Sequence, residues 1–415
     1  MPLALRDLPA GPCQLLMEWF ICCVKVLLIH QFYNTPASGG AVRSYYLAKA
    51  LVEKGIEVVV ITTHNQPSIE KWIDEGIAIH YLPVDYNNRY GFFKRIYSFW
   101  LFVWHIVKYA GNFRDADVVY AISTPLTTGL AAMWIKLRYN IPYYFEVGDL
   151  WPEAPVQMGF IKNPVLKAIL YKLEKLIYKK SIAVIALSQP IQKAIEKTAP
   201  GKKVYRIPNM ADTEFYKPET KRTEHEQRYG VQGKFVISYI GTLGLANGLE
   251  YLVHSAAHAQ TENLNIHFLI CGDGKMHDEL QRMIADTKLT NISLTGFLNR
   301  DEVREVLNVT DAVMVSYRNL PVLETGSPNK YFDGLAAGKL IAVNVGGWMK
   351  DELLQHACGI ATNPKNPIDL IDQIKPFLSD TARLIYYQQN ARRLAETTYS
   401  RKKLAERFVE IFTKG

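Results

Sequence analysis

The sequence predicts an α/β protein with two successive parallel sheets, each covered by helices on both faces. Strand-like runs rich in Val and Ile alternate with helix-compatible segments, and a polar, proline-containing stretch divides them into two series. A length of 415 residues is also enough for two domains with separate hydrophobic cores. We therefore expect an N-terminal extension at 1–23, a first domain at 24–207, a linker at 208–226 and a second domain at 227–400.

The composition is typical of a globular protein with an anionic partner. Of its residues 48% are hydrophobic and 21% charged, and the formal net charge is +8. The basic residues form no dense run, so we expect no nucleic-acid partner, whereas a membrane surface or a phosphorylated substrate fits better. Five scattered cysteines without metal or disulfide spacing favour a reducing, cytoplasmic location.

The first series opens with a buried strand at 24–32, a loop and an amphipathic helix at 41–54. The loop ends in Gly39 and Gly40, where a ligand can approach the backbone, and Arg43 lies in the first turn of the helix. A plain turn explains the two glycines equally well. The other strands of this series are expected at 57–63, 77–83, 117–123, 143–147 and 182–187.

Two helical segments of the first series are basic and apolar. Residues 92–109 combine many aromatic side chains with flanking cations, which suits a helix lying in a membrane interface. A core helix packed on the first sheet explains this segment equally well. Residues 169–180 form a second basic amphipathic stretch, which is more typical of a solvated helix face.

The second series repeats the alternation and ends in helices. Its strands are expected at 235–240, 266–271, 292–295, 312–316 and 340–345, and its last helices at 382–398 and 402–414. Within this series, residues 324–341 combine a polar loop, which contains Ser327 and Asn329, with a helix that carries Lys330 and Asp333 on one face. Helix N-termini favour anions, so a phosphate beside Lys330 and a sugar hydroxyl on Asp333 would fit. A capped surface helix with an ion pair is the alternative.

Polar and glycine-rich residues follow three further strands. Asp149 and Glu153 come after the strand at 143–147, where α/β sheets bind ligands, although Asp149 can also cap a helix. Gly241 and Gly244 open a turn whose N–H groups could hold a diphosphate. Gly272 follows the strand at 266–271 and could close over a base or sugar, although a tight turn explains it nearly as well.

The stretches FEVGDLWPEAP at 145–155 and GSPNKYFDGLAAGKLI at 326–341 carry a resemblance to a known family. They are similar to retaining GT-B glycosyltransferases of family 4, especially the UDP-N-acetyl-fucosamine transferase-like branch. The resemblance implies two Rossmann-like domains facing a cleft, with the nucleotide-sugar on the second, the acceptor on the first, and a helix at 401–415 crossing back. It also implies that no metal is needed, because helix N–H groups and cations stabilise the leaving diphosphate.

The resemblance also assigns roles to residues. Asp333 is expected on the ribose hydroxyls and Lys330 near the diphosphate. The family's Arg and Lys around the second-domain glycine turn are replaced here by Thr242 and Asn247. The expected catalytic residues are Lys330, Asp149 and Glu324; the expected nucleotide-sugar ligands are Gly241, Thr242, Gly244, Asn247, Gly272, Ser327, Asn329, Lys330 and Asp333; the expected acceptor-side residues are Gly39, Gly40, Arg43 and Glu153.

The function expected from these features is transfer of a sugar, with an N-acetylated amino sugar as the expected type, from a UDP-sugar to a lipid-linked glycan with retention of configuration. Such a transferase would serve surface polysaccharide synthesis (O-antigen, capsule or exopolysaccharide) at the inner face of the cell membrane, as a peripheral protein. Two alternatives stay open: a sugar-nucleotide epimerase or hydrolase of the same fold, and a non-catalytic, membrane-bound protein that binds nucleotide-sugars.

Overall fold

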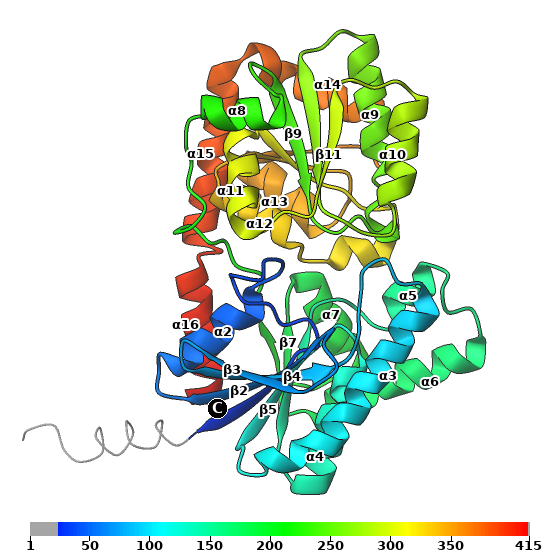
Figure 1. Ribbon diagram of the computed structural model, residues 1–415, viewed down its shortest axis with the longest axis vertical. Coiled ribbons are helices and arrows are strands. Elements are labelled where there is room, and N and C mark those ends of the chain that lie inside the picture. The colour runs from blue at the N-terminus through cyan, green and yellow to red at the C-terminus, as the bar shows by residue number, and fades with distance from the viewer. Residues whose placement is uncertain (1–23, 414–415) are drawn as a thin grey trace, which may run out of the picture.

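The computed structural model describes residues 24–413, which form two α/β lobes stacked one on the other (Figure 1). The first lobe contains an 8-stranded sheet of order β3-β4-β2-β1-β5-β6-β7-β8, and the second a 6-stranded sheet of order β11-β10-β9-β12-β13-β14. This arrangement confirms the predicted α/β fold with two Rossmann-like domains. The expected extension at 1–23 lies outside the described residues.

The first lobe contains all the predicted strands and two that were not predicted, at 70–74 and 204–206. Its strands are β1 (Lys25–Ile29), β2 (Glu57–His64), β3 (Glu70–Asp74), β4 (Ile77–Pro83), β5 (Val118–Ile122), β6 (Tyr143–Val147), β7 (Val184–Ala186) and β8 (Val204–Arg206). Its helices are α2 (Arg43–Val52), α3 (Phe92–Tyr109), α4 (Thr127–Tyr139), α5 (Glu153–Gln157), α6 (Pro164–Lys180) and α7 (Gln189–Thr198), with a 3₁₀ turn η1 (Ala110–Phe113).

Of these two strands, β3 pairs antiparallel with β4, whereas we expected parallel strands alone. Only Glu75 and Gly76 separate the two strands, and both have positive φ angles, 47° and 82°. A two-residue turn of this kind matches the strand twist and closes a hairpin, so an antiparallel edge follows.

The second lobe also begins near its predicted position. Its strands are β9 (Phe235–Ile240), β10 (Ile266–Cys271), β11 (Ile292–Gly296), β12 (Ala312–Val315), β13 (Leu340–Val343) and β14 (Gly359–Ala361). Its helices are α8 (Thr223–Tyr229), α9 (Glu250–Thr261), α10 (His277–Asp286), α11 (Arg300–Val309), α12 (Asn329–Ala336), α13 (Trp348–His356), α14 (Ile368–Ser379) and α15 (Thr381–Thr397), with 3₁₀ turns η2 (Leu245–Asn247) and η3 (Pro321–Thr325).

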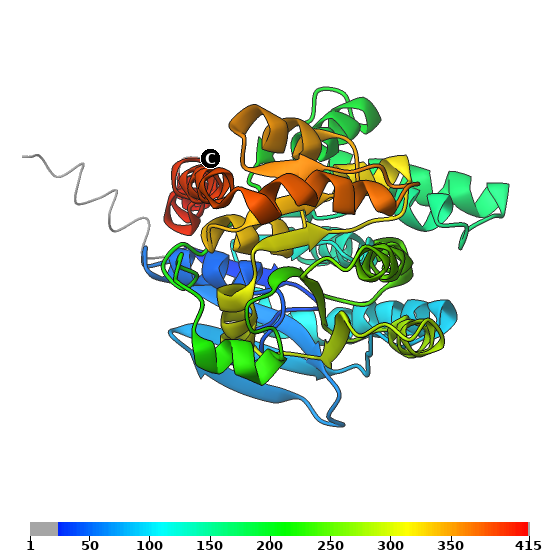
Figure 2. The same ribbon diagram turned by 90° about the horizontal axis from the view of Figure 1, so that it is seen from above.

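Helices cover both faces of the second sheet (Figure 2). Buried side chains of α9, α10 and α14 form the core on one face, and those of α12, α13 and α15 form the core on the other. The chain leaves β9 towards β10 on one side, but leaves β12 towards β13 on the opposite side. The crevice between the carboxyl ends of β9 and β12 is therefore the topological switch point, where such sheets bind ligands.

The last helix, α16 (Arg401–Thr413), returns to the first lobe (Figure 1). Phe408 is fully buried in a core shared with β1, β2 and β5, and its ring lies 5.0 Å from that of Tyr120. The two lobes are thus connected by α16 as well as by residues 207–222, which contain no helix or regular strand.

Helix α3 is amphipathic, and the interpretation of residues 92–109 as a core helix packed on the first sheet holds for one of its faces. Phe99, Phe102 and Ile106 are buried in the first lobe, whereas Phe93 and Trp100 are 86% and 54% exposed. Among the described residues, no helix combines the length and apolar character needed to cross a bilayer.

Candidate functional site

The 3₁₀ turn η3 of the second lobe lies against the first lobe near the edges where the strands end. The Ser188 hydroxyl donates to the Thr325 carbonyl at 2.6 Å, and the Val322 N–H donates to Gln157 Oε1 at 3.0 Å. These contacts hold the loop that precedes α12 between the two lobes. The start of α12 therefore faces the inter-lobe region rather than bulk solvent.

Helix α12 positions Lys330 beside the loop after β9. Tyr331 and Phe332 are fully buried in the core beneath the helix. The Lys330 ammonium lies 4.7 Å from the centre of the Tyr239 ring and 5.9 Å from that of Tyr317. The polar end of this lysine is consequently held over two aromatic rings, where a cation is attracted to the ring faces.

Lys330 is a half-buried cation without an ion-pair partner among residues 24–413. Burial lowers the pKa of Lys330 to about 8, and attraction to Asp333 opposes this shift only in part. The backbone N–H groups of Asn329 and Lys330 open the helix, where no intrahelical acceptor is available. An anion placed here would gain a charge-assisted hydrogen bond and the favourable end of the helix dipole.

The turn after β9 brings its backbone to the same place. A Cβ on Gly241, whose φ is +144°, would lie 3.3 Å from the Lys330 ammonium. A Cβ on Gly272 would lie 1.9 Å from the Gly241 carbonyl oxygen, so only glycine fits there. Gly272 thus packs closely against the Gly241 turn, while its expected contact with a base or sugar stays a prediction.

Thr242, Gly244 and Asn247 form the rest of this turn. The Asn247 amide donates to the Thr242 carbonyl at 2.6 Å, which fixes the loop, and the Thr242 side chain is exposed. Among the described residues, the N–H groups of Thr242 and Gly244 have no hydrogen-bond acceptor. The turn thus offers backbone donors in place of the cations that the resemblance would put at Thr242 and Asn247.

Asp333 lies one turn further along α12 in a small cavity of about 50 Å³. Burial raises the pKa of Asp333 to about 7, with Arg300 and Lys330 opposing the shift and Asp212 adding to it. Gly40 of the first lobe lines the same cavity. The structure thus brings Asp333, Asn329 and the first-lobe glycine loop together across the lobes.

Asp149 faces the site from the first lobe. The Thr124 hydroxyl donates to Asp149 Oδ2 at 3.3 Å, and desolvation raises the pKa of Asp149 more than this hydrogen bond lowers it. Burial raises the pKa of the Tyr317 phenol, and the charge of Asp149 raises it further. Tyr317 therefore stands between Asp149 and Lys330. Tyr317 was not among the predicted site residues, although its place two residues after the end of β12 could have indicated it.

Two further predicted residues lie in the loop before α12. The Glu324 carboxylate packs against Gly346 and Gly347, where a Cβ on Gly346 would lie 2.9 Å from Glu324 Oε1. Ser327 is buried, and its carbonyl accepts a hydrogen bond from the side chain of Asn209. Both residues shape the loop that leads to Lys330.

Arg43 and Glu153, expected on the acceptor side, are engaged within the first lobe. The Arg43 guanidinium forms an ion pair with buried Glu146 at 2.9 Å and donates to backbone carbonyls at residues 207 and 208. Glu153 accepts hydrogen bonds from Gln157, at 2.6 Å, and from Tyr171. Their expected contact with the acceptor stays a prediction, and Arg43 also lines the small cavity that contains Asp333.

The Gly39–Gly40 loop reaches the second lobe. A Cβ on Gly39, which has a φ of +74°, would lie 3.4 Å from the ring of Phe297, in the loop after β11. This approach places the first-lobe loop over the same crevice that Lys330 faces from the other side.

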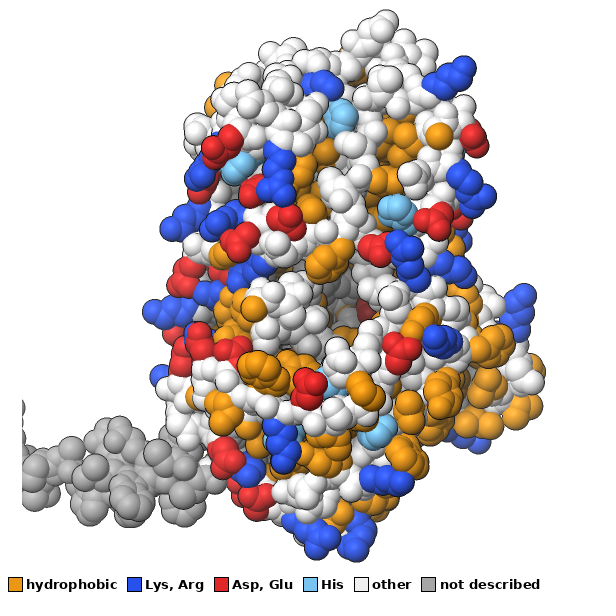
Figure 3. Space-filling model, viewed as in Figure 1, with side chains coloured by type: hydrophobic (Ala, Val, Ile, Leu, Met, Phe, Trp, Pro, Cys, Tyr) orange, Lys and Arg blue, Asp and Glu red, His pale blue; other side chains and the backbone are white. Residues whose placement is uncertain are grey.

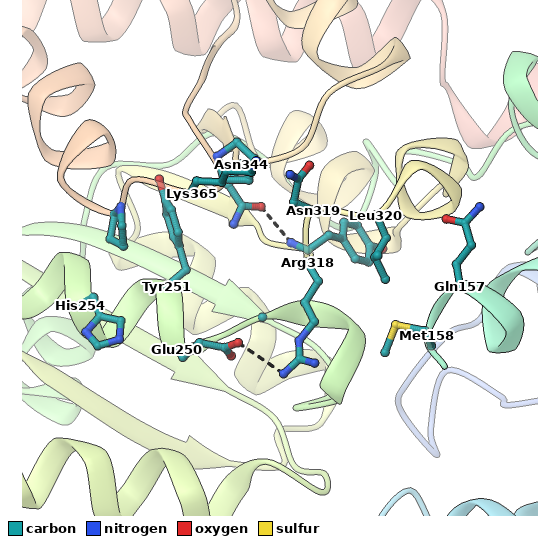
Figure 4. A pocket seen from close by; sticks show the side chains of 14 residues that line it. Gln157, Met158, Glu250, Tyr251, His254, Arg318, Asn319, Leu320, Asn344 and Lys365 are labelled. Carbon is teal, nitrogen blue, oxygen red and sulfur yellow. Dashed lines mark hydrogen bonds and ion pairs between the residues drawn. The ribbon is translucent and has the colours of Figure 1, made fainter. Parts of the chain in front are cut away.

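A pocket of about 490 Å³ opens on the α9 and α14 side of the switch point (Figure 4). Arg318 crosses it towards Glu250, with 3.4 Å between guanidinium and carboxylate. Gln157 at the end of α5 and Met158 directly after it form its first-lobe wall. Tyr317 lines this pocket while its ring is also near Lys330. The pocket and the Lys330 site are therefore separated by one side chain. Within the described part of the chain, no cluster of three or more His, Cys, Asp or Glu could hold a metal ion.

Comparison with known proteins identifies the class of this architecture. Residues 37–215 match the model of Glycosyltransferase Family 4, and residues 221–394 match that of Glycosyl transferases group 1. The two matches, one in each lobe, place the chain among the GT-B glycosyltransferases.

Two curated relatives are similar over part of their length. The chain is 23% identical over 249 residues to alpha-D-kanosaminyltransferase of Streptomyces kanamyceticus, covering 58% of this chain and 62% of that protein. It is 24% identical over 287 residues to a phosphatidylinositol N-acetylglucosaminyltransferase subunit from Arabidopsis thaliana, covering 68% and 60%. The matched regions thus span less than two thirds of either relative.

Two solved structures share the whole fold. Sucrose-phosphate synthase from Thermosynechococcus elongatus superposes with a TM-score of 0.77 at 15% identity, over 94% of this chain and 98% of that one. Anabaena HepE in complex with UDP and glucose superposes with a TM-score of 0.68 at 19% identity, over 94% and 100%.

Proposed function

We propose that the chain is a retaining glycosyltransferase that takes a sugar from a UDP-sugar bound at the Lys330 site. The observation that carries this proposal is the half-buried Lys330 ammonium, which has no carboxylate partner among the described residues and lies beside the Gly241 turn. A diphosphate supplies the missing negative charge. The unpaired N–H groups of Thr242 and Gly244 supply further donors to it.

The chemistry then rests on stabilising the leaving UDP. As the bond between sugar and diphosphate breaks, negative charge grows on the diphosphate oxygens, and Lys330 with the backbone donors stabilises it without a metal. The acceptor hydroxyl approaches the same face of the sugar, which retains the configuration. Asp149 faces this position from the first lobe, and Asp333 holds the ribose hydroxyls across from Gly40.

The acceptor in this proposal is a lipid-linked glycan, and the donor sugar is an N-acetylated amino sugar. The names of the kanosaminyl- and N-acetylglucosaminyltransferase relatives support an amino sugar, and the second relative is named for a lipid acceptor. We assign the acceptor glycan to the 490 Å³ pocket beside Tyr317. Free buried Cys271 and Cys358 fit a cytoplasmic protein that works at the inner face of the membrane, in surface polysaccharide synthesis.

Calorimetric titration with UDP tests the donor site. Lys330→Ala should weaken UDP binding roughly 10- to 100-fold, because it removes one charge-assisted hydrogen bond at a desolvated site. Lys350→Ala removes an exposed lysine from α13 and serves as the matched control, with unchanged affinity. Equal UDP affinity in Lys330→Ala and wild type would refute the proposal.

Product analysis distinguishes transfer from the alternative reactions. Incubation with a panel of UDP-sugars and membrane lipid extract should release UDP and give a glycosylated lipid. An altered sugar nucleotide or free sugar formed without extract would indicate an epimerase or hydrolase, and tight UDP-sugar binding without any product would indicate a binding protein.

A further inference from the structure

The outer side of α3 carries an exposed aromatic stripe. Phe93, Tyr97, Trp100 and Trp104 are 86%, 65%, 54% and 49% exposed. Their spacing of four, three and four residues puts all four on one side of the helix. Large aromatic side chains exposed together in this way are unusual on a monomeric surface and indicate a contact site.

Helix α6 continues the stripe. Val165, Leu166, Ile169 and Leu176 are also exposed large hydrophobics. Phe160, in the loop before α6, stacks on Phe92 of α3 with ring centres 5.2 Å apart. The two helices thus present one surface, the α3–α6 face, seen as the gathering of apolar side chains at the lower right of Figure 3.

Positive charges predominate on the α3–α6 face, where the exposed Asp85 carboxylate lies 3.7 Å from the Lys94 ammonium at its edge. Helix α3 contains no Asp or Glu, and the only acid of α6, Glu174, is buried and accepts a hydrogen bond from Tyr178 at 2.9 Å. Exposed lysines surround the apolar side chains: Lys94, Lys108, Lys172, Lys175, Lys179 and Lys180. The Lys108 ammonium lies 3.6 Å from the centre of the Trp104 ring, so a cation and an aromatic ring lie in contact on this face.

We propose that the α3–α6 face docks on a lipid bilayer that contains anionic lipids. This inference rests on the proposed function in one respect, namely that the acceptor is linked to a lipid. It adds the surface through which the protein would reach the membrane that holds this lipid. Interfacial helices bury Trp and Phe among the head groups while Lys remains at the anionic surface. A second copy of the chain would instead place one row of lysines against another, which disfavours self-association through this face.

Docking in this way also orients the acceptor pocket. Phe160 follows Met158, which lines the 490 Å³ pocket, by two residues. The first-lobe wall of the pocket therefore borders the α3–α6 face. A glycan carried by a lipid in the bilayer can enter the pocket without leaving the membrane surface.

Vesicle co-sedimentation tests the inference. Wild type should bind vesicles of phosphatidylcholine with phosphatidylglycerol, and the double variant Trp100→Ala, Trp104→Ala should bind at least about tenfold more weakly. Trp72→Ala removes a 64% exposed tryptophan from the edge strand β3 of the same lobe and should bind as wild type does. Lys172→Glu with Lys175→Glu should remove the preference for phosphatidylglycerol over phosphatidylcholine alone.

Each outcome separates docking from the proposed function. UDP affinity should be unchanged in all these variants, which shows that the fold is intact. Equal vesicle binding by wild type and the tryptophan double variant would overturn the inference, as would a wild-type dimer in light scattering that this variant dissociates. If the wild type binds vesicles but not UDP, the proposed function fails while the docking face stands.

Discussion

Arg43 and Lys330 are two desolvated cations in the first turn of a helix, yet their surroundings are opposite. The side chain of Arg43 is 9% exposed and is satisfied by Glu146, itself 2% exposed, and by two backbone carbonyls. Lys330 lies beside Gly241, and no carboxylate pairs with it in the described chain. Both positions looked alike in sequence, as a cation after a glycine-containing loop.

The difference separates a structural charge from a binding charge. Burying a charge costs free energy, and a partner within the fold offsets that cost at all times. Where the fold supplies no partner, only a bound ligand can offset the desolvation free energy of the charge. The ligand-free protein is therefore less stable by that amount. The direction of the pKa shift shows this difference, because it is lowered for Lys330 and raised for Arg43.

The comparison predicts opposite effects on stability. Arg43→Met should lower the free energy of unfolding by about 3–5 kcal/mol, because it leaves Glu146 buried without its partner. Lys330→Met should leave stability unchanged or raise it, because it removes an unpaired buried charge. Urea denaturation followed by circular dichroism measures both. A loss in Lys330→Met as large as that in Arg43→Met would show that Lys330 has a structural partner after all.

The second prediction concerns pH. The pKa of Lys330 is lowered to about 8, so the ammonium is present below this pH and is lost as the pH rises through it. UDP affinity should therefore fall only about twofold from pH 7 to 8 and then up to about tenfold per pH unit, because binding requires uptake of a proton. Calorimetry at a series of pH values measures this fall.

Lys330→Arg is the control for that profile, since a guanidinium stays charged throughout this range. Its UDP affinity should not fall between pH 8 and pH 9. If the UDP affinity of this variant still falls at alkaline pH, the proton that binding requires belongs to another group. The same lowered pKa has a consequence for stability: between about 8 and the ordinary value of 10.5 the unfolded chain binds more protons, so stability should rise with pH there.

Substitution of Asp333 should have a smaller effect on UDP affinity, limited to the contacts with the nucleoside. Asp333→Asn should weaken UDP binding about five- to tenfold through lost hydrogen bonds to the ribose, and leave inorganic diphosphate binding unchanged. Because burial raises its pKa to about 7, ionisation of Asp333 costs the folded state free energy, so the variant should also be more stable than wild type above pH 7. Equal weakening of UDP and diphosphate would place Asp333 at the phosphates instead.

The sequence was informative about the fold because hydrophobic period and loop composition are local. The predicted strands, the α12 helix start and the Gly241 turn each follow from residues adjacent in the chain, whereas the short strands β3, β8 and β14 were not predicted. Partners distant in the chain could not be predicted: Glu146 lies 103 residues after Arg43, and nothing near Arg43 indicates it. Tyr317 was missed for a related reason, because its position between Asp149 and Lys330 exists only once the lobes meet.

The smallest predicted effect tests whether the site accepts a second cation. Asn247 stands where the resemblance would put a lysine, and its amide donates to the Thr242 carbonyl at 2.6 Å. Asn247→Lys adds a charge near the Gly241 turn and should tighten UDP binding about two- to fivefold, the size expected for a partly exposed charge. The gain should shrink at high salt, because exposed charges are screened.

Asn247→Met separates charge from loop geometry, because it removes the same hydrogen bond without adding a cation. If Asn247→Lys binds UDP more tightly than Asn247→Met, the diphosphate lies within reach of this turn, on the side of Gly241 that Lys330 also faces. Equal affinities in the two variants would place the diphosphate elsewhere. Lys330 would then be a desolvated cation that binds an anion other than this diphosphate.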